Sequence, residues 1–291
     1  MKKTPLMPGI ILVIFLLLTV ACQETENPTG RIAVKVTDEP FPIAMIKDAS
    51  VTITKVEIRA AEEDTENTET TEEESSEDSP FITLWEGSRV LELMELRNGV
   101  MEELSNVEVP AGAYDLVRVV VVNASIELIN DMGDYAVDIP SGSSSGVKIF
   151  IKPGLAVAGG LTTELLLDFS VEKSFVLQGD LETPAGIKGF NFKPVIRAVN
   201  NSVAGRIEGM VVEMVDEQQV PLEGVRVYLV VDDQELSATT EEDGKYVIPG
   251  VPSGTYELWA EKDGYPTVKV EVEVIPGNAT IRDFVISALQ T

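Results

Sequence analysis

Apolar residues alternate with polar ones along most of this chain, and this period of two limits the possible folds more than any other feature. Residues 31–36 (RIAVKV) and 51–58 (VTITKVEI) alternate branched apolar side chains with polar ones, with one extra residue between Ile53 and Val56. Successive side chains of a strand point to opposite faces of a sheet, so this pattern predicts strands that are buried on one side. No long amphipathic helix is visible after residue 22. The sequence therefore predicts an all-β protein.

The chain is long enough for two hydrophobic cores, and its turn residues divide it in that way. Residues 200–202 (NNS) separate a first region, 30–199, from a second region, 205–289. In the second region, residues 225–231 (VRVYLVV) alternate strictly, and turn signals such as Asp263-Gly264 separate short strands. Short strands with turns between them predict two β-sandwich domains in tandem.

Two turn motifs carry specific expectations. Asn98-Gly99 predicts a tight hairpin between 91–93 (LEL) and 100–101 (VM), because both central residues of a type I′ turn need positive φ. The pattern V-P-x-G-x-Y occurs at 109–114 and again at 251–256. In each copy we expect a turn followed by a strand whose first tyrosine packs its ring.

The first 21 residues have the layout of a secretory signal. Two lysines precede an unbroken apolar run at 10–18, and Ala21 stands before Cys22. This site resembles the lipobox of bacterial lipoproteins, although Thr19 stands where leucine is usual. The resemblance predicts a signal-peptide helix over 1–21, lipid attachment at Cys22 and a flexible acidic tether over 22–29. The alternative is an uncleaved anchor helix, but the run is shorter than the roughly 20 residues that span a bilayer.

The charge distribution excludes some partners. The formal net charge is −27, which disfavours nucleic acid and anionic lipid headgroups as ligands. Residues 62–79 contain ten acids and no apolar residue, so we expect a disordered loop between two strands. Weak calcium binding there is the alternative, but the stretch lacks the D-x-D-x-D-G spacing that fixes oxygen ligands.

Catalytic residue types are scarce. The chain has no histidine, and its one cysteine is Cys22. Catalytic triads and histidine-containing zinc sites are therefore excluded. Asp168, which follows a run of three leucines, is the most eligible carboxylate, but an aspartate that caps backbone amides at a strand end explains it better. We expect no catalytic residue, no metal and no cofactor.

One position suggests ligand binding. In residues 255–261 (TYELWAE), alternation buries Leu258 and Ala260 and turns Trp259 outward. Tyr228 also points outward and joins Trp259 if their strands are close. Exposed aromatic rings can stack on a sugar or on a partner protein. The alternative is that Trp259 packs under a loop or against the first domain.

The second region resembles the carboxypeptidase regulatory-like domain. The residues that carry the resemblance are 224–229, 240–246, 251–258, 262–265 and 283–286. The resemblance implies a seven-stranded, transthyretin-like sandwich that is also grouped with starch-binding-like folds and serves as an accessory module. Nothing of a metallocarboxypeptidase catalytic domain is present.

Residues 30–199 are similar to an N-terminal domain of unknown function found in bacterial lipoproteins. The matching pieces are 36–40, 96–99, 109–114, 166–169 and 193–197. Members of that family often have a second acid where this chain has Ser170, which speaks against a paired-carboxylate site. The resemblance implies a β fold and a place in the cell envelope.

Together these observations predict a non-catalytic cell-envelope lipoprotein that presents two β-sandwich domains for protein interaction, adhesion or envelope assembly. Gln23 stands where an aspartate favours inner-membrane retention in some Gram-negative bacteria, and Glu24 and Glu26 resemble surface-export signals in others, so we expect an outer-membrane and surface-exposed location. The membrane is a partner through the lipid, and the further partner is a protein or a glycan. A carbohydrate-binding lipoprotein that uses Trp259 is the main alternative, and a carboxylate hydrolase ranks last.

Overall fold

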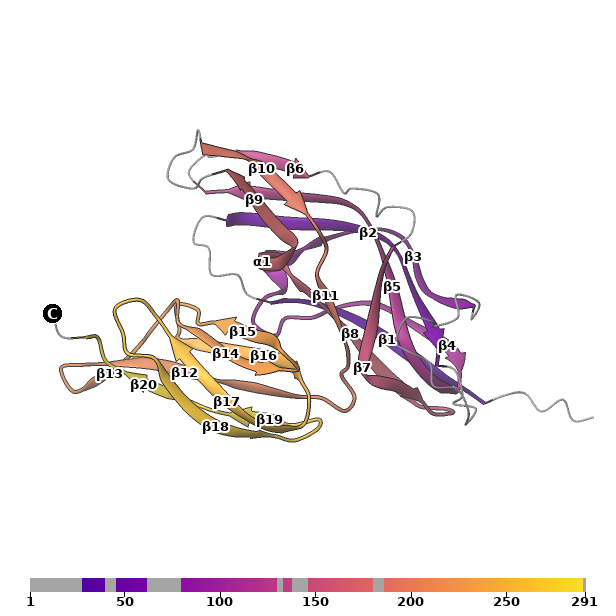
Figure 1. Cartoon of the computed structure of the whole chain (residues 1–291). Coiled ribbons are helices and arrows are strands. Elements are labelled where there is room, and N and C mark those ends of the chain that lie inside the picture. The colour runs from indigo at the N-terminus through magenta and orange to yellow at the C-terminus, as the bar shows by residue number, and fades with distance from the viewer. Residues whose placement is uncertain are drawn as a thin grey trace, which may run out of the picture.

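The computed structural model describes residues 28–39, 46–61, 80–129, 133–137, 146–179 and 186–289. They form two β domains in tandem, which confirms the predicted all-β class (Figure 1). Short helical turns occur at η1 (Leu93–Leu96), which is a 3-10 turn, and at α1 (Val171–Ser174), which is a single turn. No helix among the described residues is long and apolar enough to cross a membrane. The predicted signal segment, Cys22 and the acidic stretch 62–79 lie outside these ranges.

The first domain is built on one nine-stranded sheet with the order β3-β2-β5-β7-β11-β8-β1-β4, and β6 pairs with β5. This sheet curls around a single core, because its two edge strands meet: Arg89 Nε of β3 lies 2.7 Å from Glu102 Oε1 of β4. The strands of the domain, including the β9–β10 hairpin, are β1 (Thr29–Glu39), β2 (Ile46–Ala60), β3 (Phe81–Glu92), β4 (Glu102–Pro110), β5 (Gly112–Leu128), β6 (Asp134–Val137), β7 (Val147–Val157), β8 (Thr162–Ser170), β9 (Phe175–Gly179), β10 (Ile187–Phe192) and β11 (Ile196–Asn200).

The three successive leucines of β8 break the alternation because this strand is buried on both faces. Leu165 and Leu167 enter the core of the first domain, whereas Leu166 points out of it and clusters with Val199 and Ala204. All three leucines are fully buried. A continuous apolar run is typical of a strand that is covered on both sides. Here the second cover is the second domain.

The second domain is a sandwich of two sheets around its own core. One sheet contains β12, with β13, β16, β19 and β20 all paired to it, and the other has the order β15-β14-β17-β18. The strands are β12 (Gly205–Val215), β13 (Gln218–Pro221), β14 (Arg226–Val231), β15 (Gln234–Thr239), β16 (Lys245–Val251), β17 (Gly254–Glu261), β18 (Val268–Val274), β19 (Ala279–Ile281) and β20 (Phe284–Ile286).

The strand count of this domain differs from the seven that the resemblance implied. β19 and β20 pair in parallel with successive stretches of β12, so they are two halves of one strand that is interrupted at 282–283. β13 adds a further short strand. The alternation itself is as predicted: Val227 and Leu229 are fully buried, and the charged residues of β18 are exposed between its valines.

The Asn98-Gly99 turn forms, but it does not make a hairpin. Both residues have positive φ, 53° and 78°, and Val100 N donates to Arg97 O at 3.2 Å. However, β3 has already ended, and β3 and β4 lie at opposite ends of the strand order. Between β3 and this turn the chain forms η1, which buries two leucines in the core. The two leucines therefore reach the core from η1, and this segment does not form the predicted hairpin.

Both V-P-x-G-x-Y motifs make the same hydrogen bond. The Tyr114 hydroxyl donates to the carbonyl of Pro110 at 2.7 Å, and the Tyr256 hydroxyl donates to that of Pro252 at 3.0 Å. Each bond closes the turn between one strand and the next. Burial raises the pKa of both hydroxyls, so they remain protonated donors.

We predict that Tyr114→Phe lowers the free energy of unfolding of the first domain by about 1 kcal/mol, because the ring still packs but the hydrogen bond is lost. Urea unfolding followed by fluorescence measures the change. Tyr256→Phe, in the half-buried second copy, is the matched comparison and should have a smaller effect. An unchanged urea midpoint for Tyr114→Phe would show that the motif does not depend on this bond.

Candidate functional site

Arg197 joins the two domains. It lies on β11 opposite Asp168 of β8, and its Nη2 and Nε lie 2.6 and 3.2 Å from Asp168 Oδ2. The same guanidinium donates from Nη1 to the carbonyl of Gly250 at 2.8 Å and from Nη2 to that of Pro249 at 3.4 Å, both in β16. Arginine has five donors in a planar fork, so one side chain can hold a carboxylate and two carbonyls together. The Asp168 and Arg197 side chains are only 9% and 18% exposed, which limits screening of this pair by water.

The Asn98-Gly99 turn forms a second contact between the domains. Gly99 lies so close to Val247 that an added Cβ would be 2.6 Å from its Cγ1. Asn98 Nδ2 donates to Glu241 Oε1 at 2.8 Å. The buried cluster of Leu166, Val199 and Ala204, with Met101 against it, adds apolar contact. The turn that the sequence predicted thus docks the first domain onto β16 and the turn before it.

The linker between the domains is held from both sides. Asn201 Nδ2 donates to Glu164 Oε2 at 2.9 Å, and Glu164 N donates to Ser202 Oγ at 2.8 Å. From the second domain, Gly277 N donates to Ala204 O at 2.8 Å. Burial alone would raise the pKa of Glu164, but hydrogen bonds from Lys35 and Asn201 outweigh it and lower this pKa, so the carboxylate is charged at neutral pH. The linker therefore has little freedom to act as a hinge.

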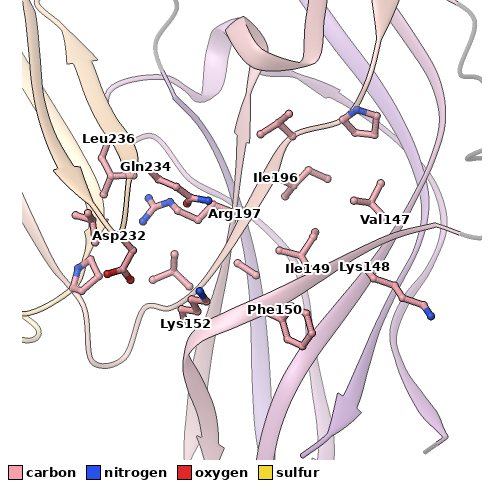
Figure 2. A pocket seen from close by; sticks show the side chains of 16 residues that line it. Val147, Lys148, Ile149, Phe150, Lys152, Ile196, Arg197, Asp232, Gln234 and Leu236 are labelled. Atoms are coloured by element: carbon pink, nitrogen blue, oxygen red, sulfur yellow. The ribbon is translucent and has the colours of Figure 1, made fainter. Parts of the chain in front are cut away.

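A cleft opens beside this interface (Figure 2). Its larger hollow, about 430 Å³, is lined by β7, by residues 194–199 and by the turn between β14 and β15. A neighbouring hollow of about 360 Å³ also includes Arg197, Gln234 and Leu236. In Figure 2, Arg197 points from β11 across to these second-domain residues. Hollows of this size, with a few polar groups on apolar walls, are typical of small-molecule sites.

The cleft combines cations from one domain with polar groups from the other. Lys148, Phe150 and Lys152 of β7 line it on the first domain. Asp232 and Gln234 line it on the second, where Asp232 belongs to a turn whose two central residues have positive φ. The first wall is therefore basic and aromatic, and the second carries a carboxylate and an amide.

The structure brings Trp259 and Tyr228 together on the outer face of the four-stranded sheet. They are direct partners in the register of β14 and β17, and their rings are nearly parallel with centroids 6.2 Å apart. The Arg226 guanidinium lies over the Tyr228 ring at 4.6 Å, and Lys269 Nζ lies over the Trp259 ring at 4.9 Å. A sugar that stacked on those ring faces would have to displace the cations.

The structure does not show the expected capping role of Asp168, since its carboxylate accepts hydrogen bonds from Arg197 and not from backbone amides of the described residues. Sequence reasoning did not single out Arg197. Its signals were its place at the end of the 193–197 piece of the family resemblance and its position between Ile196 and Ala198, on the last strand before the boundary. Among the described residues, no group of His, Cys, Asp or Glu is arranged to hold a metal ion.

The fold and the interface define a two-domain, all-β protein. Its domains are joined by the contacts of Arg197, here called the Arg197 lock, and by a short linker that forms hydrogen bonds with both domains. The chain belongs to the family described as Domain of unknown function (DUF4382), which matches residues 29–194. The carboxypeptidase regulatory-like domain matches residues 206–287. The order of the two families predicted from the sequence is thus confirmed. No curated protein matches the chain.

Several solved structures are distantly similar. The Bacillus anthracis TIE protein is 11% identical, with 89% of this chain and 41% of that protein covered and a TM-score of 0.28. GBS52, the minor pilin of Streptococcus agalactiae, is 12% identical, with 89% and 97% covered and a TM-score of 0.28. A double mutant of the shaft pilin SpaA from Lactobacillus rhamnosus GG is 11% identical, with 91% and 98% covered and a TM-score of 0.27. TM-scores of this size do not establish a common fold.

We predict that Arg197→Met destabilises the first domain by about 3 kcal/mol, because it leaves the Asp168 carboxylate buried without its cation. It should also separate the unfolding of the two domains into two calorimetric transitions, because the carbonyls of β16 lose their donor. The double variant Asp168→Leu/Arg197→Met should regain much of the stability but not the coupling.

Arg206→Met is the matched control, since the exposed Arg206–Glu208 pair contributes at most about 1 kcal/mol. A single calorimetric transition in Arg197→Met, with the wild-type midpoint, would show that the contacts of Arg197 do not couple the two domains.

Proposed function

We propose that this chain is a lipid-anchored cell-envelope protein that acts by binding, not by catalysis, and that holds its two β domains in one fixed arrangement. The observation that carries the proposal is the Arg197 lock, in which one side chain contacts Asp168 and two carbonyls of the other domain. A fixed pair of domains keeps the cleft between them formed before any partner arrives. Preformed sites avoid the entropy cost of ordering on binding.

The sequence before β1 supports the anchor. Cys22 follows a short apolar run and small residues, and β1 begins seven residues later at Thr29. Even fully extended, seven residues span at most about 25 Å. Lipid on Cys22 therefore keeps the start of β1 close to the membrane surface. Our proposal places this anchor in the outer membrane.

The direction of β1 then sets which domain is farther from the membrane. Its first residues contact the 159–161 turn, as in the bond from Gly160 N to Thr29 O. Near its other end, Asp38 lines a small hollow with Ser237 and Pro249 of the second domain. The two ends are about 30 Å apart at the usual rise of a strand. Figure 1 shows β1 running from the far side of the first domain toward the second domain. With the anchor before β1, we therefore place the second domain farther from the membrane than the first.

Binding accounts for the surface better than catalysis does. The chain has no histidine, and its most eligible carboxylate, Asp168, is engaged by Arg197. The two matching families are described as a domain of unknown function and a carboxypeptidase regulatory-like domain, and the second description names a regulatory module, not a catalytic domain. What the molecule offers is a cleft with mixed polar and apolar walls. The second candidate function, carbohydrate binding by Trp259, draws on the stacked pair that Trp259 forms with Tyr228.

We predict that Cys22→Ser releases the protein from the membrane fraction, because we propose that lipid on this residue is what holds it there. Both domains should keep their wild-type unfolding midpoints, since Cys22 precedes every strand of the fold. Fractionation with a carbonate wash, followed by immunoblotting, gives the distribution. Cys22→Ser protein that still pelleted with membranes would favour the uncleaved anchor helix.

We also predict that a probe on the first domain lies nearer the bilayer than one on the second. Leu161→Cys, beside the start of β1, and Val220→Cys, on β13, are both exposed sites. The chain has no cysteine besides Cys22, which the lipid occupies, so each variant takes one dye. In liposomes with a headgroup acceptor, energy transfer should be strong from position 161 and weak from position 220. Equal transfer from both positions would contradict the membrane-distal placement.

A further inference from the structure

One face of β7 carries a lysine–phenylalanine–lysine row. Lys148, Phe150 and Lys152 are all exposed, and they alternate with Ile149 and Ile151, which turn toward the core. Same-face neighbours on a strand are about 7 Å apart, so one ammonium group can reach each side of the phenyl ring. All three residues line the larger hollow of the cleft.

Two members of this row have unused binding capacity. Phe150 is 59% exposed, and in the described part of the chain no ring stacks on it and no cation lies over it. Lys152 makes no hydrogen bond or ion pair with any described residue. The rings of Tyr228 and Trp259 differ in this respect, because each already carries a cation. An exposed aromatic ring next to an unpaired cation is unusual in a chain of net charge −27.

The opposite wall supplies neutral and acidic hydrogen-bonding groups. Asp232 and Gln234 are exposed at the turn between β14 and β15, and both line the same hollow. A carboxylate accepts hydrogen bonds from hydroxyls, and an amide both accepts and donates. In Figure 2, Asp232 and Gln234 lie across from Phe150, and Lys152 lies between Asp232 and Phe150. The walls belong to different domains, so the site exists only while the Arg197 lock holds them together.

We propose that this cleft binds an acidic saccharide, a sugar that bears a carboxylate. Its carboxylate would pair with Lys152, the apolar face of its ring would lie on Phe150, and its hydroxyls would meet Asp232 and Gln234. Charge explains why the acid is required: the chain carries a net charge of −27, and the lining of this hollow supplies cations in Lys148, Lys152 and Arg197. An acidic peptide would satisfy the lysines but would leave the hydroxyl-binding wall unused. The inference rests on the proposed function, namely that the chain acts by binding.

The test is calorimetric titration of full-length Cys22→Ser protein with digalacturonate, and with the uncharged lactose as the neutral comparison. We expect binding of digalacturonate that weakens with added salt, and at least tenfold weaker binding of lactose. Lys152→Gln and Phe150→Ala should each reduce the digalacturonate affinity at least fivefold. Lys188→Gln removes a lysine on β10 away from the cleft and should leave the affinity unchanged. Unfolding midpoints confirm that each variant is folded, and both cleft residues are exposed enough for the changes to be tolerated.

Four results would overturn the proposal. They are no binding of digalacturonate, equal binding of lactose, a loss of affinity in Trp259→Ala but not in Phe150→Ala, and tighter binding of an oligoglutamate peptide than of the sugar. The third would move the site to the outer face of the second domain, and the fourth would make the ligand a peptide. None of them bears on membrane attachment, which fractionation of Cys22→Ser tests separately.

Discussion

The structure of this chain depends on one guanidinium. Arg197 donates to one oxygen, Oδ2, of a nearly buried carboxylate within its own domain and to two carbonyls in the next domain. Arginine stays charged at every physiological pH, so the lock does not rely on a titrating cation. The geometry also favours glycine at position 250, where φ is +62° and an added Cβ would lie 2.9 Å from Leu166 Cδ2. The orientation of the domains follows from these contacts.

The cleft is a product of that orientation. Its basic wall comes from β7, its polar wall from the turn after β14, and neither wall is a pocket alone. The held linker and the docked Asn98-Gly99 turn oppose opening in addition to Arg197. A ligand site that spans two domains usually requires a closing motion, with its cost in free energy. In this chain Arg197, the docked turn and the linker hold the two walls in one arrangement.

Local sequence patterns predicted the local structure well. Alternation located the strands, glycine and asparagine located the turns, and the repeated V-P-x-G-x-Y motif located two turns with the same hydrogen bond. What the sequence did not reveal depends on residues far apart in the chain. The curl of the sheet and the role of Arg197 both require knowing which strands are neighbours. The lysine–phenylalanine–lysine row of β7 can be read directly from the sequence. It becomes part of a cleft only because the second domain lies opposite to it, which the sequence does not reveal. The three leucines of β8 were a signal of two-sided burial, yet they do not say what covers the second side.

The place of β1 has a mechanical consequence. This strand lies between β4 and β8, with nine partner residues in β8 and eight in β4, and β8 is bonded in turn to β11, which leads into the second domain. A pull between a membrane anchor before Thr29 and a partner held by the second domain would act along these strands. Hydrogen bonds loaded in that direction share the force and must break together, instead of opening one after another from an end. A tethered protein built in this way can carry tension from its partner to the membrane without unfolding first at its tether.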